Sequence, residues 1–234
     1  MDFQELHSWD MTPAEAQAQQ TALRSRVSLI DDFGEIKTIA GLDLSYNEER
    51  NEGYAVVVVL SFPSFEILET RYATATPKMP YIPGLLSFRE SPVALEAFKQ
   101  LETVPDLLMT DGQGLAHPRG FGIACHLGVL LDIPSVGVAK TFLYGQYDKT
   151  QALAPGESTP LLDKNKKEEI GAVVQTKLRT NPLYVSPGHK VSVASATRLV
   201  LESIRGYRLP EPTRQAHNLI SAYRKMVINP GATG

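Results

Sequence analysis

Two aspartates stand at positions where their carboxylates could hold a metal ion. Asp43 interrupts the apolar stretch 39–46, at a position that would be half-buried in a strand, and burying a lone charge is costly. Asp111 directly follows the apolar run 107–110, at the end of a second predicted strand, where open α/β sheets commonly bind ligands. If the two strands are neighbours, both carboxylates reach one cleft. Oxygen ligands of this kind suit Mg²⁺.

Three more side chains could serve the same cleft. Glu90 is a third carboxylate, expected in the loop that precedes a helix opening at Ser91, and Lys140 closes a strand as a possible phosphate contact or nucleophile. His217, in the final predicted helix, could orient water or contact phosphate. Such a set suits the hydrolysis of a phosphodiester. Taken singly, each has a structural interpretation too, because Asp caps turns, Glu suits helix starts, and Lys or His is often solvated.

The segment Pro80-Tyr81-Ile82-Pro83-Gly84 sets an aromatic and a β-branched side chain between two prolines. A stiff loop with large apolar tips can unstack nucleic-acid bases, although a rigid turn that packs Tyr81 on the core explains the composition equally well. The loop comes just before Arg89-Glu90, which would put its tips beside the acidic cleft. Farther along, His117-Pro118-Arg119-Gly120 is typical of a helix start, where backbone amides could meet phosphate.

The first part of the chain predicts a mixed sheet. Thr12 and Glu15 have the spacing of a capping box, which predicts a helix to about residue 27. Three stretches rich in β-branched and aromatic residues, 36–46, 54–62 and 66–76, predict an antiparallel meander. A helix over 91–101, a strand over 106–110, a helix over 118–131 and a strand over 135–140 follow. The strand–helix–strand unit favours parallel pairing.

The second part predicts less regular structure. Residues 142–167 contain glycines, prolines and a lysine cluster, and we expect a mobile surface loop there. Strand character resumes over 170–178 and 183–185, helices are predicted over 193–205 and 213–227, and the tail 229–234 is expected to fray. Without an internal repeat or a linker of contrasting composition, residues 1–234 are expected to form a single domain of helices against a central sheet.

Composition and charge limit the class of protein. Apolar residues make up 43% and charged residues 21% of the 234 positions, as in soluble globular proteins. The net charge of −3 gives no global sign of nucleic-acid binding but is compatible with a basic groove on an acidic body. Cys125 is the single cysteine, no signal-peptide pattern opens the chain, and no apolar run approaches the roughly 20 residues that span a bilayer. We therefore expect a cytoplasmic monomer without membrane contact.

Several motifs, taken in order, resemble the endonuclease V family. They are Gly41-Leu42-Asp43, Pro80-Tyr81-Ile82-Pro83-Gly84, Phe88-Arg89-Glu90, Asp111-Gly112-Gln113-Gly114, His117-Pro118-Arg119 and Gly137-Val138-Ala139-Lys140. The resemblance covers roughly residues 39–217, and short pieces such as Asp-Gly are specific only through this order. Two positions depart from the family's pattern, since Gln113 stands where Asn is frequent and Gly120 where a basic residue is common. Both bear on lesion preference and leave the acidic set intact.

The resemblance implies an α/β, RNase H-like three-layer fold with a central mixed five-stranded sheet flanked by helices. Asp43 and Asp111 would be the principal ligands of Mg²⁺, for which Mn²⁺ could substitute, and Glu90 would complete the acidic site directly or through water. Lys140 and His217 would support water and phosphate as further catalytic residues. The residues implied to contact DNA and the lesion are Pro80, Tyr81, Ile82, Pro83, Gly84, Arg89, Gly112, Gly114 and His117.

The implied activity is that of a DNA repair endonuclease. The family recognises deaminated bases such as deoxyinosine, flips them out of the helix and hydrolyses the second phosphodiester on the 3′ side, leaving 3′-hydroxyl and 5′-phosphate ends. Inosine-containing RNA is a further candidate partner beside damaged DNA. Two other functions stay open: an RNase H-like nuclease on RNA or junction substrates, which the loop at 80–84 disfavours, and a noncatalytic nucleic-acid-binding module, which the acidic set disfavours. The sequence does not rank inosine against xanthine, uracil or abasic sites.

Overall fold

The β-branched and aromatic residues after residue 36 form the expected meander. In the computed structural model, which describes residues 1–165 and 167–228, β1 (Thr38–Asn47), β2 (Glu52–Ser61) and β3 (Ile67–Ala75) pair antiparallel in chain order. β1 and β2 are largely buried, whereas β3 is mostly half-exposed at the edge of the sheet. The residues of β2 from 53 to 60 are all buried, which explains their nearly unbroken run of apolar side chains.

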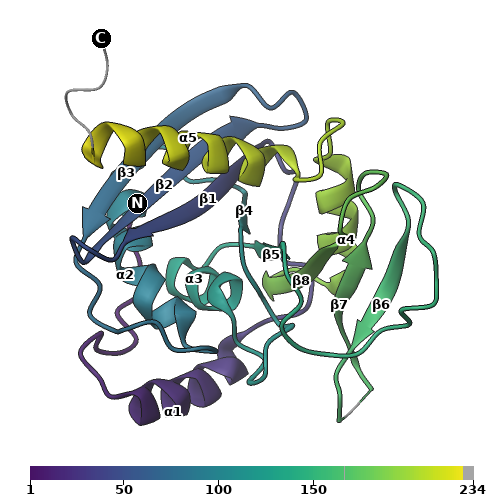
Figure 1. Cartoon of the computed structure of the whole chain (residues 1–234), viewed down its shortest axis with the longest axis horizontal. Coiled ribbons are helices and arrows are strands. Elements are labelled where there is room, and N and C mark those ends of the chain that lie inside the picture. The colour runs from purple at the N-terminus through teal and green to yellow at the C-terminus, as the bar shows by residue number, and fades with distance from the viewer. Residues whose placement is uncertain (166, 229–234) are drawn as a thin grey trace.

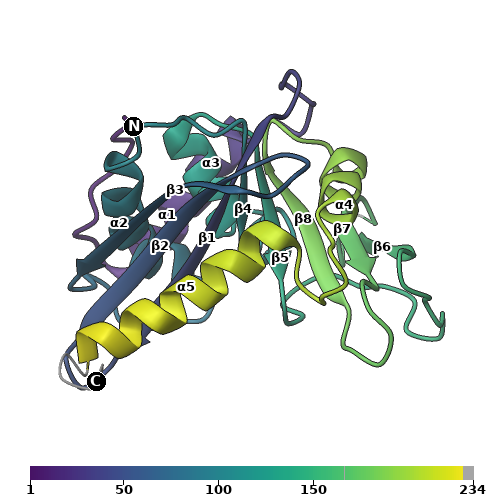
Figure 2. The same ribbon diagram turned by 90° about the horizontal axis from the view of Figure 1, so that it is seen from above.

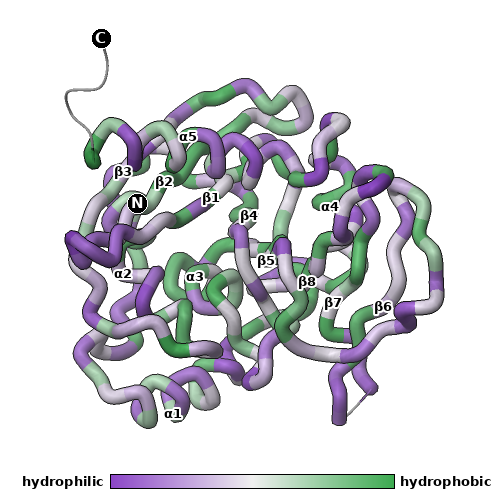
Figure 3. The backbone as a smooth tube through the Cα atoms, in the orientation of Figure 1, coloured by the Kyte–Doolittle hydropathy of each residue, from purple (hydrophilic) through white to green (hydrophobic). Residues whose placement is uncertain are grey.

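A parallel crossover follows the meander, also as expected. β4 (Leu107–Thr110) lies beside β1 in parallel, and α3 (Ile123–Leu131) connects it to β5 (Ser135–Ala139), which is parallel to β4. The register pairs Leu42 with Thr110, so the next residues along the two strands, Asp43 and Asp111, are also neighbours. Every residue of α3 is buried, as a helix that is hydrophobic on all sides requires, and Figure 3 shows its hydrophobic colouring.

The sheet has eight strands, so the prediction of five was too few. The order is β3-β2-β1-β4-β5-β8-β7-β6, where the additional strands are β6 (Ser158–Leu162), β7 (Glu169–Val174) and β8 (Leu183–His189). β6 falls inside the segment 142–167 that we expected to be a loop. Pro160 argued against a strand here, because proline cannot donate to a neighbouring strand and is rare in sheets outside edge strands. β6 is an edge strand, where proline is tolerated. Buried Thr159 and Leu161 alternate with exposed neighbours.

Helices cover both faces of the sheet (Figures 1 and 2). One core lies between the sheet and the helices α4 (Val193–Glu202) and α5 (Glu211–Ile228), and α5 crosses β1 and β2. The other core lies between the sheet and α2 (Leu86–Lys99) together with α3. Residues alternate between the two cores along β1, since Ile39 belongs to the first and Ala40 to the second. The predicted three-layer arrangement is therefore confirmed.

Two helices begin elsewhere than the sequence indicates. α2 starts at Leu86 and not at Ser91, and Pro92 lies inside it, because buried Leu85 and Phe88 hold the preceding turns in the core. α3 starts only at Ile123, since Gly120 adopts a left-handed backbone with φ of 61° that interrupts any helix from Pro118. The first helix, α1 (Pro13–Leu23), has the expected capping box and continues as a 3₁₀ turn over Arg24–Arg26.

No helix among the described residues is long and apolar enough to cross a membrane. Cys125 is buried and unbridged in α3, as expected of a packing residue. The tail 229–234 lies outside the described residues.

Candidate active site

Four of the predicted catalytic side chains meet as two pairs, beside the middle of β1 and the ends of β4 and β5. Asp43 is only 7% exposed on β1, and its Oδ2 lies 2.9 Å from Nδ1 of His217 on α5. Asp111 directly follows β4, and its Oδ2 forms an ion pair with Nζ of Lys140, which directly follows β5. The parallel register of β1, β4 and β5 puts the middle of β1 level with the ends of β4 and β5, because Leu42 pairs with Thr110 and Thr110 with Gly137. The crossover topology thus brings residues from distant parts of the chain into one site.

Glu90 approaches this cluster from the second turn of α2, not from a loop as the sequence indicated. Burial, with the negative charges of Asp111 and Asp43 adding to it, raises the pKa of Glu90 to about 8. Burial also raises the pKa of Asp111, where the adjacent Lys140 opposes the shift. Three carboxyl groups are therefore close enough to repel one another electrostatically. An additional cation at this place would relieve that repulsion.

The donor set fits a hard divalent cation by its chemistry. Carboxylate oxygens at a half-buried site are ligands that Mg²⁺ and similar ions accept. One oxygen of Asp43 faces the ring of His217 and one oxygen of Asp111 pairs with Lys140, and the described residues hold no three acidic, His or Cys side chains positioned to ligate one ion together. The match between these residues and a divalent cation consequently rests on two facts: Asp43, Glu90 and Asp111 converge, and their negative charges repel one another.

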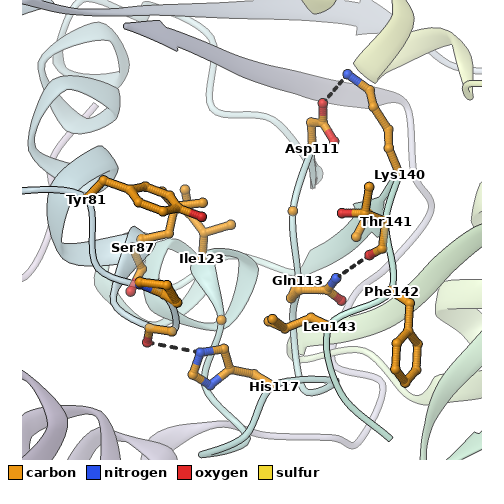
Figure 4. Close-up of a pocket in the computed structure, with 16 residues that line it drawn as sticks. Tyr81, Ser87, Asp111, Gln113, His117, Ile123, Lys140, Thr141, Phe142 and Leu143 are labelled. Carbon is orange, nitrogen blue, oxygen red and sulfur yellow. Dashed lines mark hydrogen bonds and ion pairs between the residues drawn. The ribbon is translucent and has the colours of Figure 1, made fainter. Parts of the chain in front are cut away.

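A cavity of about 390 Å³ opens beside the acidic cluster and shares Asp111 and Lys140 with it. Figure 4 shows the ring of Tyr81 on one side of the cavity and Phe142 on the other, with Asp111 and Lys140 at one end and His117 at the other. Its volume lies in the range of pockets that bind small molecules. Most of the lining is apolar, and the Tyr81 side chain is 62% exposed at its rim. A flat ring the size of a nucleobase suits such a slot.

The loop that carries Tyr81 is anchored at Gly84. The carbonyl oxygen of Gly84 accepts hydrogen bonds from Nε2 of Gln20 (3.1 Å), Nε2 of His117 (3.1 Å) and Nη2 of Arg119 (2.6 Å). Burial, reinforced by the charge of Arg119, lowers the pKa of His117 to about 4, so the ring is neutral near pH 7. Its Nδ1 accepts from the backbone amide of Arg119, which leaves the proton on Nε2 for Gly84. Three donors on one carbonyl fix the base of the loop.

Comparison with known proteins decides the family. A family model described as Endonuclease V matches residues 21–218. The chain belongs to the endonuclease V family. The Endonuclease V of Gloeobacter violaceus is 46% identical over 222 residues, covering 94% of this chain and 89% of that protein. That of Azotobacter vinelandii is 47% identical over 213 residues, covering 91% and 95%.

Solved structures of endonuclease V proteins have the same fold. The Streptomyces avermitilis protein superposes with a TM-score of 0.87 at 36% identity, covering 94% of this chain and 96% of that one. The Ciona intestinalis protein, solved with a 24mer DNA that contains an inosine followed by a ribo-adenosine, has a TM-score of 0.83 at 26% identity, covering 92% and 98%. The resemblance seen in the motifs is therefore confirmed across nearly the whole chain.

Only some of the residues predicted to contact DNA line the cavity. Tyr81, Pro83, Gly84, Gly112 and His117 line the cavity. Other predicted contact residues do not. Ile82 packs toward a buried cluster, and a Cβ at Gly114 would lie only 2.2 Å from the carbonyl oxygen of Pro187, so this glycine is required by packing within the protein.

The remaining two predicted contacts also lie outside the cavity lining. The guanidinium of Arg89 stacks 4.0 Å from the ring centroid of Tyr46, and Pro80 is exposed at the rim of the loop. The sequence analysis did not identify several residues that anchor or line the cavity. Gln20 bonds to Gly84 without any local sequence signal, while Phe142 and Leu143 line the cavity. The local signal for Phe142 and Leu143 is that two large apolar residues follow the polar pair Lys140-Thr141.

Proposed function

We propose that this protein nicks DNA beside deaminated bases, deoxyinosine foremost, by hydrolysing the second phosphodiester on the 3′ side of the lesion and leaving 3′-hydroxyl and 5′-phosphate ends. One observation carries the proposal: the base-sized cavity and the acidic cluster share Asp111 and Lys140. A base that enters the cavity therefore holds its own strand against the carboxylates. Inosine-containing DNA bound to the related Ciona intestinalis protein supports the choice of lesion.

The cavity accounts for selectivity through base flipping. A mispaired hypoxanthine costs less to unstack than a normal base pair, and the exposed ring of Tyr81 is placed to fill the gap that the flipped base leaves. Apolar side chains that line the cavity, Ile123 and Leu143 among them, would bury the faces of the base. The anchored carbonyl at Gly84 keeps the Tyr81 loop in position while the duplex is distorted.

The acidic cluster accounts for the chemistry. Asp43 and Asp111 would hold a divalent cation, with Glu90 completing the site directly or through water; we propose Mg²⁺, with Mn²⁺ able to substitute. The bound ion would supply charge stabilisation to the phosphate during hydrolysis. Lys140 would neutralise a phosphate oxygen, and His217 would orient water or contact phosphate. The ion pair of Lys140 with Asp111 and the half-exposed ring of His217 beside Asp43 support these roles.

The decisive experiment replaces the two proposed ligands. Asp43→Ala and Asp111→Ala should each abolish Mg²⁺-dependent nicking of an inosine-containing duplex, while circular dichroism shows an intact fold. Asp32→Ala, which removes an exposed carboxylate elsewhere, is the matched control and should nick normally. Near wild-type nicking by either folded ligand variant would eliminate the proposed site. Running the same enzymes on lesion-bearing DNA and RNA strands ranks the substrates, and cleavage of RNA hybrids without inosine would replace the lesion-specific function.

Further features complete the proposal. We infer that residues 1–234 act as one nuclease domain, as a monomer in the cytoplasm, with damaged DNA as the principal partner and inosine-containing RNA as a second one. The single continuous sheet, to which the helices of both cores pack, supports one domain. Gel filtration with light scattering tests the monomer directly, and a stable dimer would overturn it.

A further inference from the structure

Beside the active site, but outside it, lies a second group of cationic and aromatic side chains. Tyr207, in the loop between α4 and α5, is 52% exposed. The guanidinium carbon of Arg214 lies 4.3 Å from the centroid of its ring, and Nζ of Lys177 lies 5.8 Å from that centroid. We call Lys177, Tyr207 and Arg214 the Tyr207 platform. An exposed aromatic ring among cations is the chemistry that binds single nucleic-acid strands.

Glu211 fixes the position of Arg214 in the platform. Buried Glu211 accepts a hydrogen bond from Nε of Arg214 at 2.8 Å and pairs with its Nη2 as well. Because two donors of the guanidinium are bound in a fork, the plane of Arg214 is fixed and supports the ring of Tyr207. A ring positioned in this way loses little conformational entropy when a base stacks on it. Lys177 is exposed and presents its ammonium beside the same ring.

Hydrogen bonds tie the platform to the catalytic strand end. Nη2 of Arg208, the residue after Tyr207, donates to the carbonyl oxygens of Lys140 (2.8 Å) and Pro182 (3.1 Å). The carbonyl oxygen of Arg208 accepts from Oγ1 of Thr176, next to Lys177, at 2.7 Å. The loop of Tyr207 and the segment of Lys177 are thereby joined to each other and to the end of β5. The loop that carries Tyr207 is thus bonded to the backbone of Lys140.

Helix α5 also connects the platform to the active site, because it carries both Arg214 and His217. Arg214 precedes His217 by three residues, so the two side chains share one face of α5. The platform therefore adjoins Lys140 and His217. In Figure 4 the ribbon of α5 passes beyond Lys140, at the end of the cavity opposite His117. A strand that leads from the cavity across the acidic cluster continues toward the platform.

We propose that the Tyr207 platform binds the cleaved strand on the 3′ side of the scissile bond. This inference rests on the proposed function, because cutting 3′ to the lesion defines which way the strand leaves the cavity. The lesion base occupies the cavity, the scissile phosphate faces Asp43 and Asp111, and the following nucleotides reach Tyr207. The ring stacks on a base, whatever its identity, and Lys177 contacts a phosphate. Substrates with nucleotides beyond the cut should thus bind more tightly.

Two inosine-containing single strands test the platform, one with a long 3′ tail and one that ends at the first nucleotide after the scissile bond. Wild type should bind the long tail roughly tenfold more tightly, as one base–aromatic stack predicts. Tyr207→Ala should remove most of this difference, leaving the part due to Lys177, without changing affinity for the short strand, whereas Tyr207→Phe should retain it. Lys177→Ala should lower the salt dependence of long-tail binding by a slope of about 0.7, the share of one phosphate contact.

The control is Lys37→Ala, which removes an exposed lysine just before β1, at the end of that strand away from Asp43, and should change neither quantity. Thermal unfolding checks that each variant is folded, and exposed Lys177 tests the platform even if Tyr207→Ala is unstable. Failure of wild type to nick the long-tail strand would overturn the proposed function. Normal nicking with an unchanged tail preference in Tyr207→Ala, or an equal loss for both strands, would overturn the platform alone.

Discussion

The close contact between β1 and α5 allows a sharp test with a single methyl group. A Cβ built at Gly41 would lie 2.0 Å from the carbonyl oxygen of Pro212, at the start of α5, whereas ordinary contact begins at 3.4 Å. In Gly41→Ala the helix must therefore retreat by about 1.4 Å, the difference between those distances. His217 lies on the same helix, 2.9 Å from Asp43, so such a retreat breaks their hydrogen bond.

Two measurements should respond to that retreat. Overpacking of this kind costs about 1–3 kcal/mol of unfolding free energy, which urea denaturation resolves as a lower midpoint. The rate of single-turnover nicking should fall on the order of a hundredfold, because the proposed catalytic group His217 is displaced by about 1 Å. Gly34→Ala is the matched control, since no atom lies within 4 Å of a Cβ there. An unchanged midpoint and rate in Gly41→Ala would refute the reasoning from this contact.

Three further outcomes follow from the site and the core. Lys140→Ala should slow single-turnover nicking less than loss of Asp111 does, because it assists phosphate without being a principal ligand; an unchanged rate removes it from the site. Tyr81→Ala should lose roughly tenfold in affinity for inosine-containing duplex and much less for undamaged duplex, compared in binding assays at one salt concentration; equal losses identify a turn residue. Without divalent cations, stability to urea should rise as the pH falls from 8 to 6.5, because burial raises the pKa of Glu90 to about 8 and the folded chain takes up this proton first. Below pH 6.5 the buried His126 and His117 should oppose that gain, because burial lowers their pKa values and both take up protons preferentially in the unfolded chain. A midpoint that stays flat between pH 8 and 6.5 contradicts this account.

The sequence predicted the features that depend on local periodicity. The meander, the crossover from β4 to β5 and the meeting of Asp43 with Asp111 all follow from apolar runs and their order, and the structure has them. Local rules failed where a distant contact overrides them. Pro160 argued against a strand where β6 forms an edge strand. Ser91-Pro92 suggested a helix start, although α2 begins at Leu86 and packs Phe88 in the core.

The candidate site shows the same division. The residue types of Asp111 and Lys140 were visible as strand-end polar residues, but their pairing depends on the alignment of two strands. Gln20 could not be found at all, since its partners Gly84 and Phe121 are 64 and 101 residues away in the chain. The contact of Arg89 with DNA stays a prediction, and its stacking on Tyr46 is a tertiary contact that motif spacing does not encode.

The pair formed by Asp43 and His217 has a consequence for the timing of protein synthesis. The two residues are 174 positions apart, which a ribosome covers in roughly 10–35 s. During that interval the growing chain carries Asp43, then Glu90 and Asp111, without the helix that packs over β1 and brings His217 to them. Nascent chains therefore lack the Asp43–His217 pair until α5 has been synthesised and packs against β1.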